Sequence, residues 1–218
     1  MIVVVGSLAW RDTAPKGPAG RACAVALAAA SRGGRVEIAG RVGEDLEGDA
    51  LLFALTKAGV GHVAVIRDPA RRTPIAAPPP PEDDDVSPLA RVEAAPADPG
   101  LRLDAADATL ALRYLDPEGV LVVTDDVAPE ALAAAVEGGQ FAGMRLVLLV
   151  DEAVASTAAL PADATILAVP EPDADDGAGA FEVLVGAFAA ALDAGATPKE
   201  AFAAASRGAA WEPVADEA

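Results

Sequence analysis

Five short runs of apolar residues stand out along the chain. They are rich in Val, Ile and Leu, and several are apolar at consecutive positions rather than at alternate ones. This pattern is typical of strands in a parallel sheet that is covered on both faces. The predicted strands are 2–5, 35–39, 120–124, 145–150 and 165–169.

Ala-rich segments lie between these runs and after the last one, and their composition predicts helices. Gly33 follows the first segment, Pro129 begins the third and Thr197 precedes the last, which are favoured residues at helix ends. The predicted helices are 18–32, 45–58, 129–138, 179–194 and 198–210. Alternating strands and helices predict a three-layer α/β/α fold with a mainly parallel, Rossmann-like sheet and right-handed crossovers.

The middle of the chain has a different character. Four prolines at 78–81 are followed by four acidic residues at 82–85, which predicts an exposed hairpin tip or mobile loop over 78–87. The flanking segments, 73–77 and 89–94, look like β-arms. We therefore expect a single domain over 1–218, with 73–94 as a short lid-like or hairpin excursion.

Composition excludes several classes of protein. A hydrophobic content of 53% supports a sizeable core, and a net charge of −18 argues against a nucleic-acid partner. No apolar run approaches the roughly 20 residues of a membrane span, and the N-terminus lacks the basic region of a signal peptide. Cys23 is the single cysteine, so a cytoplasmic protein without an internal disulfide is expected.

Metal chemistry is restricted as well. The chain has one histidine, His62, and one cysteine, so it is a poor candidate for a Cys/His zinc site. We expect no resident metal. A metal that takes part in the chemistry would be an oxygen-bound ion such as Mg²⁺, brought in by a phosphate ligand.

Four stretches, taken in order, resemble a known family. They are the first strand and turn at 3–8, a Gly-rich loop and helix at 17–28, the "G-x-x-G-x-D-x-x-G" turn at 40–48, and the segment 175–192. The last is similar to a catalytic "D-T-x-G-A-G-D-x-F" segment with its helix. The chain thus resembles the PfkB/ribokinase-like carbohydrate kinase family, which includes ribokinase, adenosine kinase and fructokinases.

The resemblance implies transfer of the ATP γ-phosphoryl group to a sugar or nucleoside hydroxyl, with Mg²⁺. Backbone N–H groups of Gly177, Ala178 and Gly179 would form an anion hole for the phosphate. Two alignment registers put either Ala180 or Glu182 at the position of the catalytic base.

Substrate contacts are implied at Asp12, Gly17 and Gly20.

The chain departs from the family at several of these positions. Ala22 stands where the family has a substrate-binding Asn, Arg11 stands where it has an Asp, and Asp12 is one place late. In the register that makes Glu182 the base, Phe181 replaces the last glycine of the anion hole. We therefore expect weak or absent phosphoryl transfer. The alternative function is that of a non-catalytic, kinase-derived small-molecule binder or a dimeric partner protein.

Several residues keep two interpretations. Glu182 is either a base or a solvated glutamate in the first turn of a helix. The pairs Asp125-Asp126 and Asp151-Glu152 follow predicted strands, where ligands of open α/β sheets bind, so a binding role is open for both pairs. Asp45 is expected to cap a helix, Cys23 to lie in the core and His62 to lie in an exposed loop.

The two predicted lid arms also indicate that the protein associates with a second copy of itself. The family often dimerises through its lid strands, and the arms 73–77 and 89–94 carry apolar residues that a monomer would expose. We expect a homodimer in which these arms meet their symmetry mates.

Overall fold

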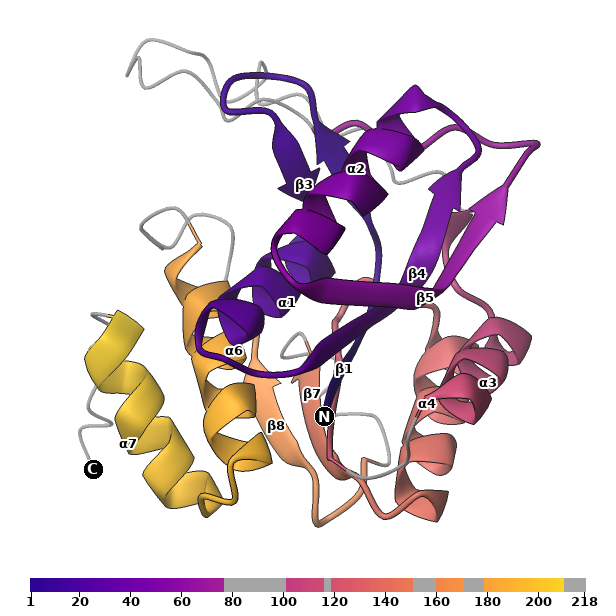
Figure 1. The fold of residues 1–218 in the computed structure, drawn as a ribbon. Coiled ribbons are helices and arrows are strands. Elements are labelled where there is room, and N and C mark those ends of the chain that lie inside the picture. The colour runs from indigo at the N-terminus through magenta and orange to yellow at the C-terminus, as the bar shows by residue number, and fades with distance from the viewer. Residues whose placement is uncertain (77–100, 116–118, 151–159, 171–178, 210–218) are drawn as a thin grey trace, which may run out of the picture.

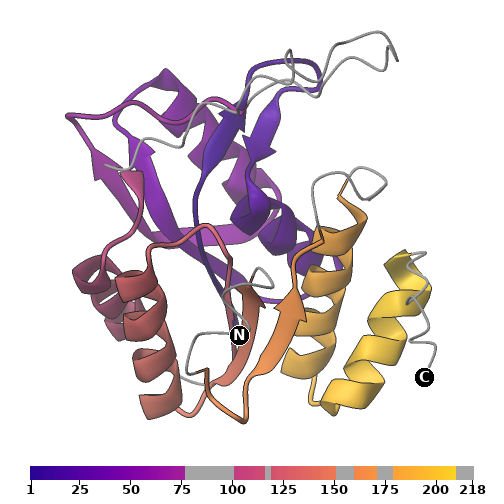
Figure 2. The ribbon, with the colours of Figure 1, turned by 180° about the vertical axis from the view of Figure 1, so that it is seen from behind.

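The computed structural model describes residues 1–76, 101–115, 119–150, 160–170 and 179–209. Its centre is a six-stranded sheet in the order β5-β4-β1-β6-β7-β8, in which every pairing is parallel (Figures 1 and 2). The strands are β1 (Ile2–Val5), β4 (Val36–Gly43), β5 (Val60–Asp68), β6 (Val120–Val123), β7 (Arg145–Val150) and β8 (Thr165–Ala168). The expected mainly parallel sheet is confirmed.

Strand β1 lies at the centre of this sheet. All four of its residues are fully buried, and it pairs with β4 on one side and β6 on the other. The chain then adds strands outward in two directions, first β4 and β5 and later β6, β7 and β8. The direction of winding therefore reverses between β1 and β6, which makes the carboxyl ends of these two strands the topological switch point of the sheet.

Helices cover both faces, as expected for three layers. They are α1 (Arg21–Ser31), α2 (Leu46–Lys57), α3 (Ala105–Tyr114), α4 (Pro129–Phe141), α6 (Ala180–Asp193) and α7 (Pro198–Ala209). The helices α1, α2 and α6 pack on one face, α3 and α4 pack on the other, and α7 lies against α6 (Figures 1 and 2). None of the helices in these described ranges is long and apolar enough to cross a membrane.

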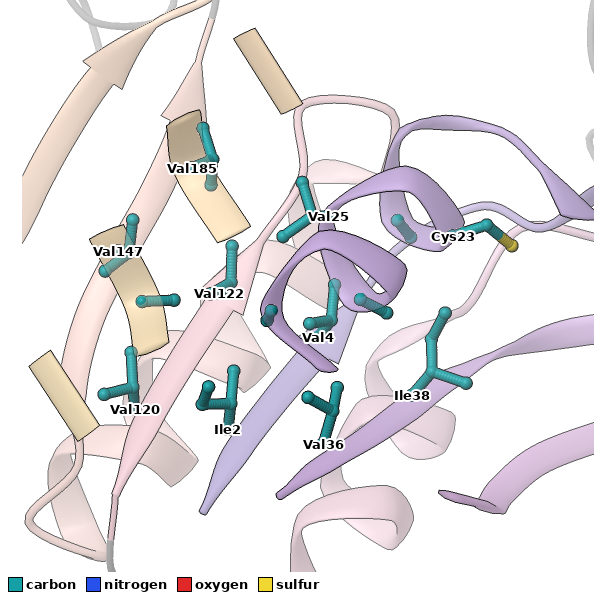
Figure 3. Close-up of a cluster of buried hydrophobic side chains, with 14 of the residues drawn as sticks. Ile2, Val4, Cys23, Val25, Val36, Ile38, Val120, Val122, Val147 and Val185 are labelled. Atoms are coloured by element: carbon teal, nitrogen blue, oxygen red, sulfur yellow. The ribbon is translucent and has the colours of Figure 1, made fainter. Parts of the chain in front are cut away.

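Alternation along the strands divides the core in two. Ile2 and Val4 point to the layer of α1 and α6, where they meet Val25 and Val185 (Figure 3). Val3 and Val5 belong to the opposite cluster, under α3 and α4. Because every residue of β1 faces one helix layer or the other, the strand has to be apolar throughout.

Helices α1 and α6 approach each other closely at Gly186. A Cβ built there would lie 2.6 Å from the Cβ of Ala28 and 2.7 Å from the carbonyl oxygen of Val25. Only glycine allows this approach, which sets the spacing of the two helices beside the switch point. The Ala-rich surface of α1 thus serves close packing.

A second, two-stranded antiparallel sheet consists of β2 (Ala9–Arg11) and β3 (Gly17–Ala19). We did not predict these strands. Residues 73–76, the described part of the first expected arm, run beside β2: the N–H of Trp10 donates to the carbonyl of Pro74 at 2.8 Å, and the N–H of Ala76 donates to the carbonyl of Trp10 at 2.9 Å. The second arm, 89–94, and the acidic run Asp83-Asp84-Asp85 lie outside the described residues.

Two elements of the main fold were also missed. We predicted no strand at β5 and no helix at α3. His62 lies in β5 and not in a loop, and its Nε2 is 3.0 Å from the hydroxyl of Thr56, so that expectation was wrong. The edge position of β5 explains the miss, because Gly61, His62 and Arg67 interrupt its apolar pattern.

The turn after β4 is held by Asp45, which caps α2 as expected. Its carboxylate accepts the N–H of Gly48 at 2.8 Å, the N–H of Thr73 at 2.8 Å and the hydroxyl of Thr73 at 2.6 Å. Partial burial acts to raise the pKa of Asp45, but these hydrogen bonds outweigh burial and hold that pKa below its ordinary value. The carboxylate form therefore joins the start of α2 to the segment that continues into the small sheet.

Replacing Asp45 with Ala should lower the free energy of unfolding at pH 7 by about 2 kcal/mol, because a helix cap and two bonds to Thr73 are lost. The folded-state pKa is lowered, so this stabilisation is complete above the unfolded pKa of about 4 and is lost as the pH falls through the folded value. Urea unfolding of both proteins between pH 7 and pH 2.5 measures the difference. A difference that stays constant down to pH 2.5 would contradict this role.

Candidate functional site

A polar cluster lies at the switch point, where β1 and β6 end. The N–H of Ser7, just after β1, donates to the Asp126 carboxylate at 3.3 Å, and the buried hydroxyl of Thr124 also donates to that carboxylate. The chain has to be glycine at position 6, because a Cβ there would lie 2.0 Å from the Thr124 hydroxyl oxygen. The loop after β6 is thus tied tightly to the loop after β1.

Arg21 joins this cluster to the helix layer. It is the first residue of α1, and its guanidinium donates from Nε to Glu182 in α6 at 3.0 Å and from an Nη atom to Asp125 after β6. The side chains of Arg21, Asp125 and Glu182 are 26%, 23% and 14% exposed. The ion pairs are therefore shielded from solvent on most sides, and they connect three elements that lie far apart in sequence.

The position of Arg21 at a helix start is compensated by these partners. A cation in the first turn of a helix opposes the helix dipole, and α1 has neither an acidic residue in its first turn nor a side-chain cap. Burial acts to lower the pKa of Arg21, but the pairing with Asp125 and then with Glu182 outweighs burial and raises that pKa above its ordinary value. The two carboxylates thus compensate for an arginine placed where the helix alone would disfavour it.

The structure brings several of the residues singled out in the sequence to this place. Glu182 lies in the first turn of α6, and Gly179 precedes that helix in the left-handed conformation at φ 92°. Gly20 precedes α1 at φ 88°, and a Cβ there would lie 2.9 Å from the carbonyl oxygen of Ser7. Gly177 and Ala178 of the expected anion hole, together with the pair Asp151-Glu152, lie outside the described residues.

Other expected substrate residues lie on the small sheet. Gly17 begins β3, and Asp12 lies in the exposed turn between β2 and β3, where its carboxylate accepts Lys16 Nζ at 2.6 Å. Arg11 donates to the carbonyl of Pro15 in the same turn. These contacts lie within the turn and stabilise it.

Two positions of the first helix carry no accessible polar group. Ala22 is fully buried, so it offers only a methyl group where the resemblance implies Asn. Cys23 is fully buried too, and burial raises the pKa of its thiol to about 12, as expected for a core residue rather than a reactive thiol.

No three His, Cys, Asp or Glu side chains within the described ranges gather closely enough to hold a metal ion. Two of the carboxylates at the switch point, Asp125 and Glu182, both bind Arg21. Mg²⁺ would thus fit this part of the chain only in company with the phosphates of a bound nucleotide.

Arg21 is the site residue that we missed in the sequence. It is visible there as a lone basic residue at the start of an Ala-rich helix that has no acid in its first turn. Such a local conflict between a charge and the helix dipole points to compensation from elsewhere in the fold. The partners, 104 and 161 residues away along the chain, follow only from the topology.

Comparisons with known proteins show what the chain is similar to. Residues 9–78 match the family model "pfkB family carbohydrate kinase". A search of curated proteins finds no match. Solved structures that share the fold include the following three. Ribokinase from Arabidopsis thaliana, complexed with ribose and ATP, has 17% identity and a TM-score of 0.69, over 95% of this chain and 90% of that one.

The other two structures match similar shares of the two chains. Aminoimidazole riboside kinase from Salmonella enterica has 16% identity and a TM-score of 0.63, over 96% of this chain and 92% of that one. A carbohydrate kinase from Agrobacterium tumefaciens has 17% identity and a TM-score of 0.64, over 96% and 89%. At these identities the structures establish the fold. The resemblance seen in the sequence is confirmed at this level: residues 9–78 match the pfkB family model, and the fold is similar to that of ribokinase-like carbohydrate kinases.

Proposed function

We propose that the protein binds a small hydroxylated molecule, a sugar or a nucleoside, at the carboxyl ends of β1 and β6, and that its transfer of phosphate from ATP is weak or absent. The observation that carries this proposal is the pairing of Glu182 with Arg21 at 3.0 Å. A general base has to reach the proton of the attacking hydroxyl, and this carboxylate is already engaged by a guanidinium.

Binding is favoured by the position of the cluster. Ligands of open α/β sheets bind outside the carboxyl ends of strands at the switch point, where Ser7, Asp125 and Asp126 lie here. The solved structures of similar fold include a ribokinase complexed with ribose and ATP and an aminoimidazole riboside kinase. A pentose or a nucleoside is accordingly the ligand class to examine first.

Loss of transfer is supported by the substituted positions. Ala22 is buried without a polar group, and Arg11 is occupied within the turn of the small sheet. In the family, polar side chains that hold the substrate hydroxyls are implied at these positions. A ligand held by fewer groups would be oriented less accurately for in-line transfer, which depends on positioning and on stabilisation of charge.

The active alternative keeps the family chemistry. Glu182 lies in the first turn of α6 after the left-handed Gly179, which is where the resemblance implies the base and the anion hole. ATP would supply the phosphoryl group, and Mg²⁺ would accompany its phosphates. Glu182 would have to leave Arg21 and take the proton of the substrate hydroxyl.

An ATP-consumption assay with Mg²⁺ and a panel of ribose, fructose and adenosine separates these functions. We expect ADP formation at the background rate for every compound, unchanged by Glu182→Gln. We also expect at least one panel member to stabilise the fold in a thermal-shift assay, by about 2.7 kcal/mol at 100 times its dissociation constant.

Glu130→Gln is the matched control, because Glu130 is an exposed glutamate in the first turn of α4, on the opposite face of the sheet. Turnover well above background that falls 100-fold or more in Glu182→Gln, but not in Glu130→Gln, would establish the active alternative. Absence of any stabilisation across the panel would instead count against the binding proposal.

We also retain a cytoplasmic homodimer as part of the proposal. Cys23 is the single cysteine of the chain, which suits a reducing compartment. Segment 73–76 pairs with β2 along one edge, and Ile75 is 53% exposed. A short apolar edge of this kind is a suitable surface for a symmetry mate.

Light scattering at high micromolar concentration in 0.15 M salt should report a dimer. Association should weaken at low salt, because the net charge of −18 on each chain is then less screened. Ile75→Asp should shift the equilibrium toward monomer. A monomer at 0.15 M salt, or an association that Ile75→Asp leaves unchanged, would rule out this interface.

A further inference from the structure

The hydrogen-bonding capacity of Arg21 is directed toward the protein. Its Nε donates to Glu182 and an Nη donates to Asp125, so its planar fork faces two carboxylates of its own chain. A guanidinium fork is the group best shaped to bind phosphate in two-point fashion. In this structure the fork is used internally.

The side chains of the cluster are mostly acceptors. The cluster holds three carboxylates, Asp125, Asp126 and Glu182, and one guanidinium, Arg21, so these four side chains carry a net charge of −2. The Ser7 N–H and the Thr124 hydroxyl donate to Asp126 and so occupy part of the hydrogen-bonding capacity of its carboxylate. Each carboxylate of the cluster has further lone pairs that accept hydrogen bonds. A ligand at this place meets acceptor oxygens and negative charge.

Such surroundings discriminate by ligand charge. Hydroxyl groups of a sugar donate well to carboxylates, whereas a phosphate has only negative oxygens to present to them and is repelled. Arg21 does not offset this repulsion, because its charge is already compensated by Asp125 and Glu182. The pairing state of one arginine therefore decides which class of compound the site accepts.

We propose that Arg21 is the specificity-determining residue of this site: paired with Asp125 and Glu182, it restricts the site to neutral, hydroxyl-rich ligands and excludes their phosphorylated forms. This inference rests on the proposed binding function. It goes beyond that function in naming the charge that the ligand must have and the residue that sets this preference. It further implies that neutralising the partners of Arg21 would free the fork and admit a phosphate.

The test compares matched pairs of ligands, D-ribose with D-ribose 5-phosphate and adenosine with adenosine 5′-monophosphate, by calorimetry on the full chain. We expect the neutral member of a pair to bind at least ten times more tightly to the wild-type protein. In the double variant Asp125→Asn with Glu182→Gln, we expect that ratio to fall at least tenfold, because the phosphate gains the guanidinium and loses two repelling charges. Both replacements keep the shape of the side chain, and the thermal midpoint verifies folding.

Two further variants separate specificity from a merely structural effect. Arg21→Ala in the double-variant background should remove the gained phosphate binding and restore preference for the neutral ligand. Arg32→Ala, an exposed arginine at the other end of α1, should leave every ratio within twofold of its parent. Loss of fold stability alone would weaken both members of a pair equally and would not move the ratio.

Equal or tighter binding of the phosphorylated ligand by the wild-type protein would overturn the inference while leaving the proposed binding function intact. An unchanged ratio in the double variant would overturn it in the same way. If no member of either pair binds at millimolar concentration, the proposed function fails, and the inference fails with it.

Discussion

The parallel pairing of β1 with both β4 and β6 is the constraint on which the rest of the structure depends. Since β1 is buried on both faces and bonded along both edges, the later strands have to be added outward from it in two directions. That reversal creates the two helix layers and opens a switch point where the carboxyl ends of β1 and β6 diverge. The start of α1 and the start of α6 are brought to this place, and the Gly186 contact fixes their spacing.

The chemistry of the site follows from what the two helices place there. The family chemistry implied by the sequence needs a free base near an anion hole, whereas here α1 supplies Arg21 and α6 supplies Glu182, which pair with each other. An ion pair shielded from solvent is costly to break, because each partner would be left as an uncompensated charge. The same contact therefore opposes phosphoryl transfer and shapes what the site is able to bind.

The sequence was sufficient to predict the strands of the sheet interior, because burial on both faces leaves an unbroken apolar run such as Ile2–Val5. It was not sufficient for β5 or α3. The edge strand alternates irregularly, and α3 begins with the capping box of Asp104 and Asp107, which uses an aspartate where the usual pattern has Glu or Gln. Arg41 of β4 binds Asp107 at 2.7 Å, so tertiary contacts support that helix start.

For the site, local signals located its loops and helix starts, including Gly20, Gly179, Glu182 and Asp125-Asp126. The pairing among them could not be predicted, because the partners of Arg21 are defined by sheet order and helix spacing, neither of which is encoded in a short motif. The proposed function of the site thus depends on the ion pair of Arg21 with Glu182.

A double-mutant cycle tests that contact most directly. Urea unfolding of the wild type, Arg21→Met, Glu182→Gln and the double variant gives the coupling free energy between the two side chains. We predict a favourable coupling of about 1 kcal/mol or more at low salt. A coupling indistinguishable from zero would show that Arg21 does not hold Glu182 in solution, and would contradict the account.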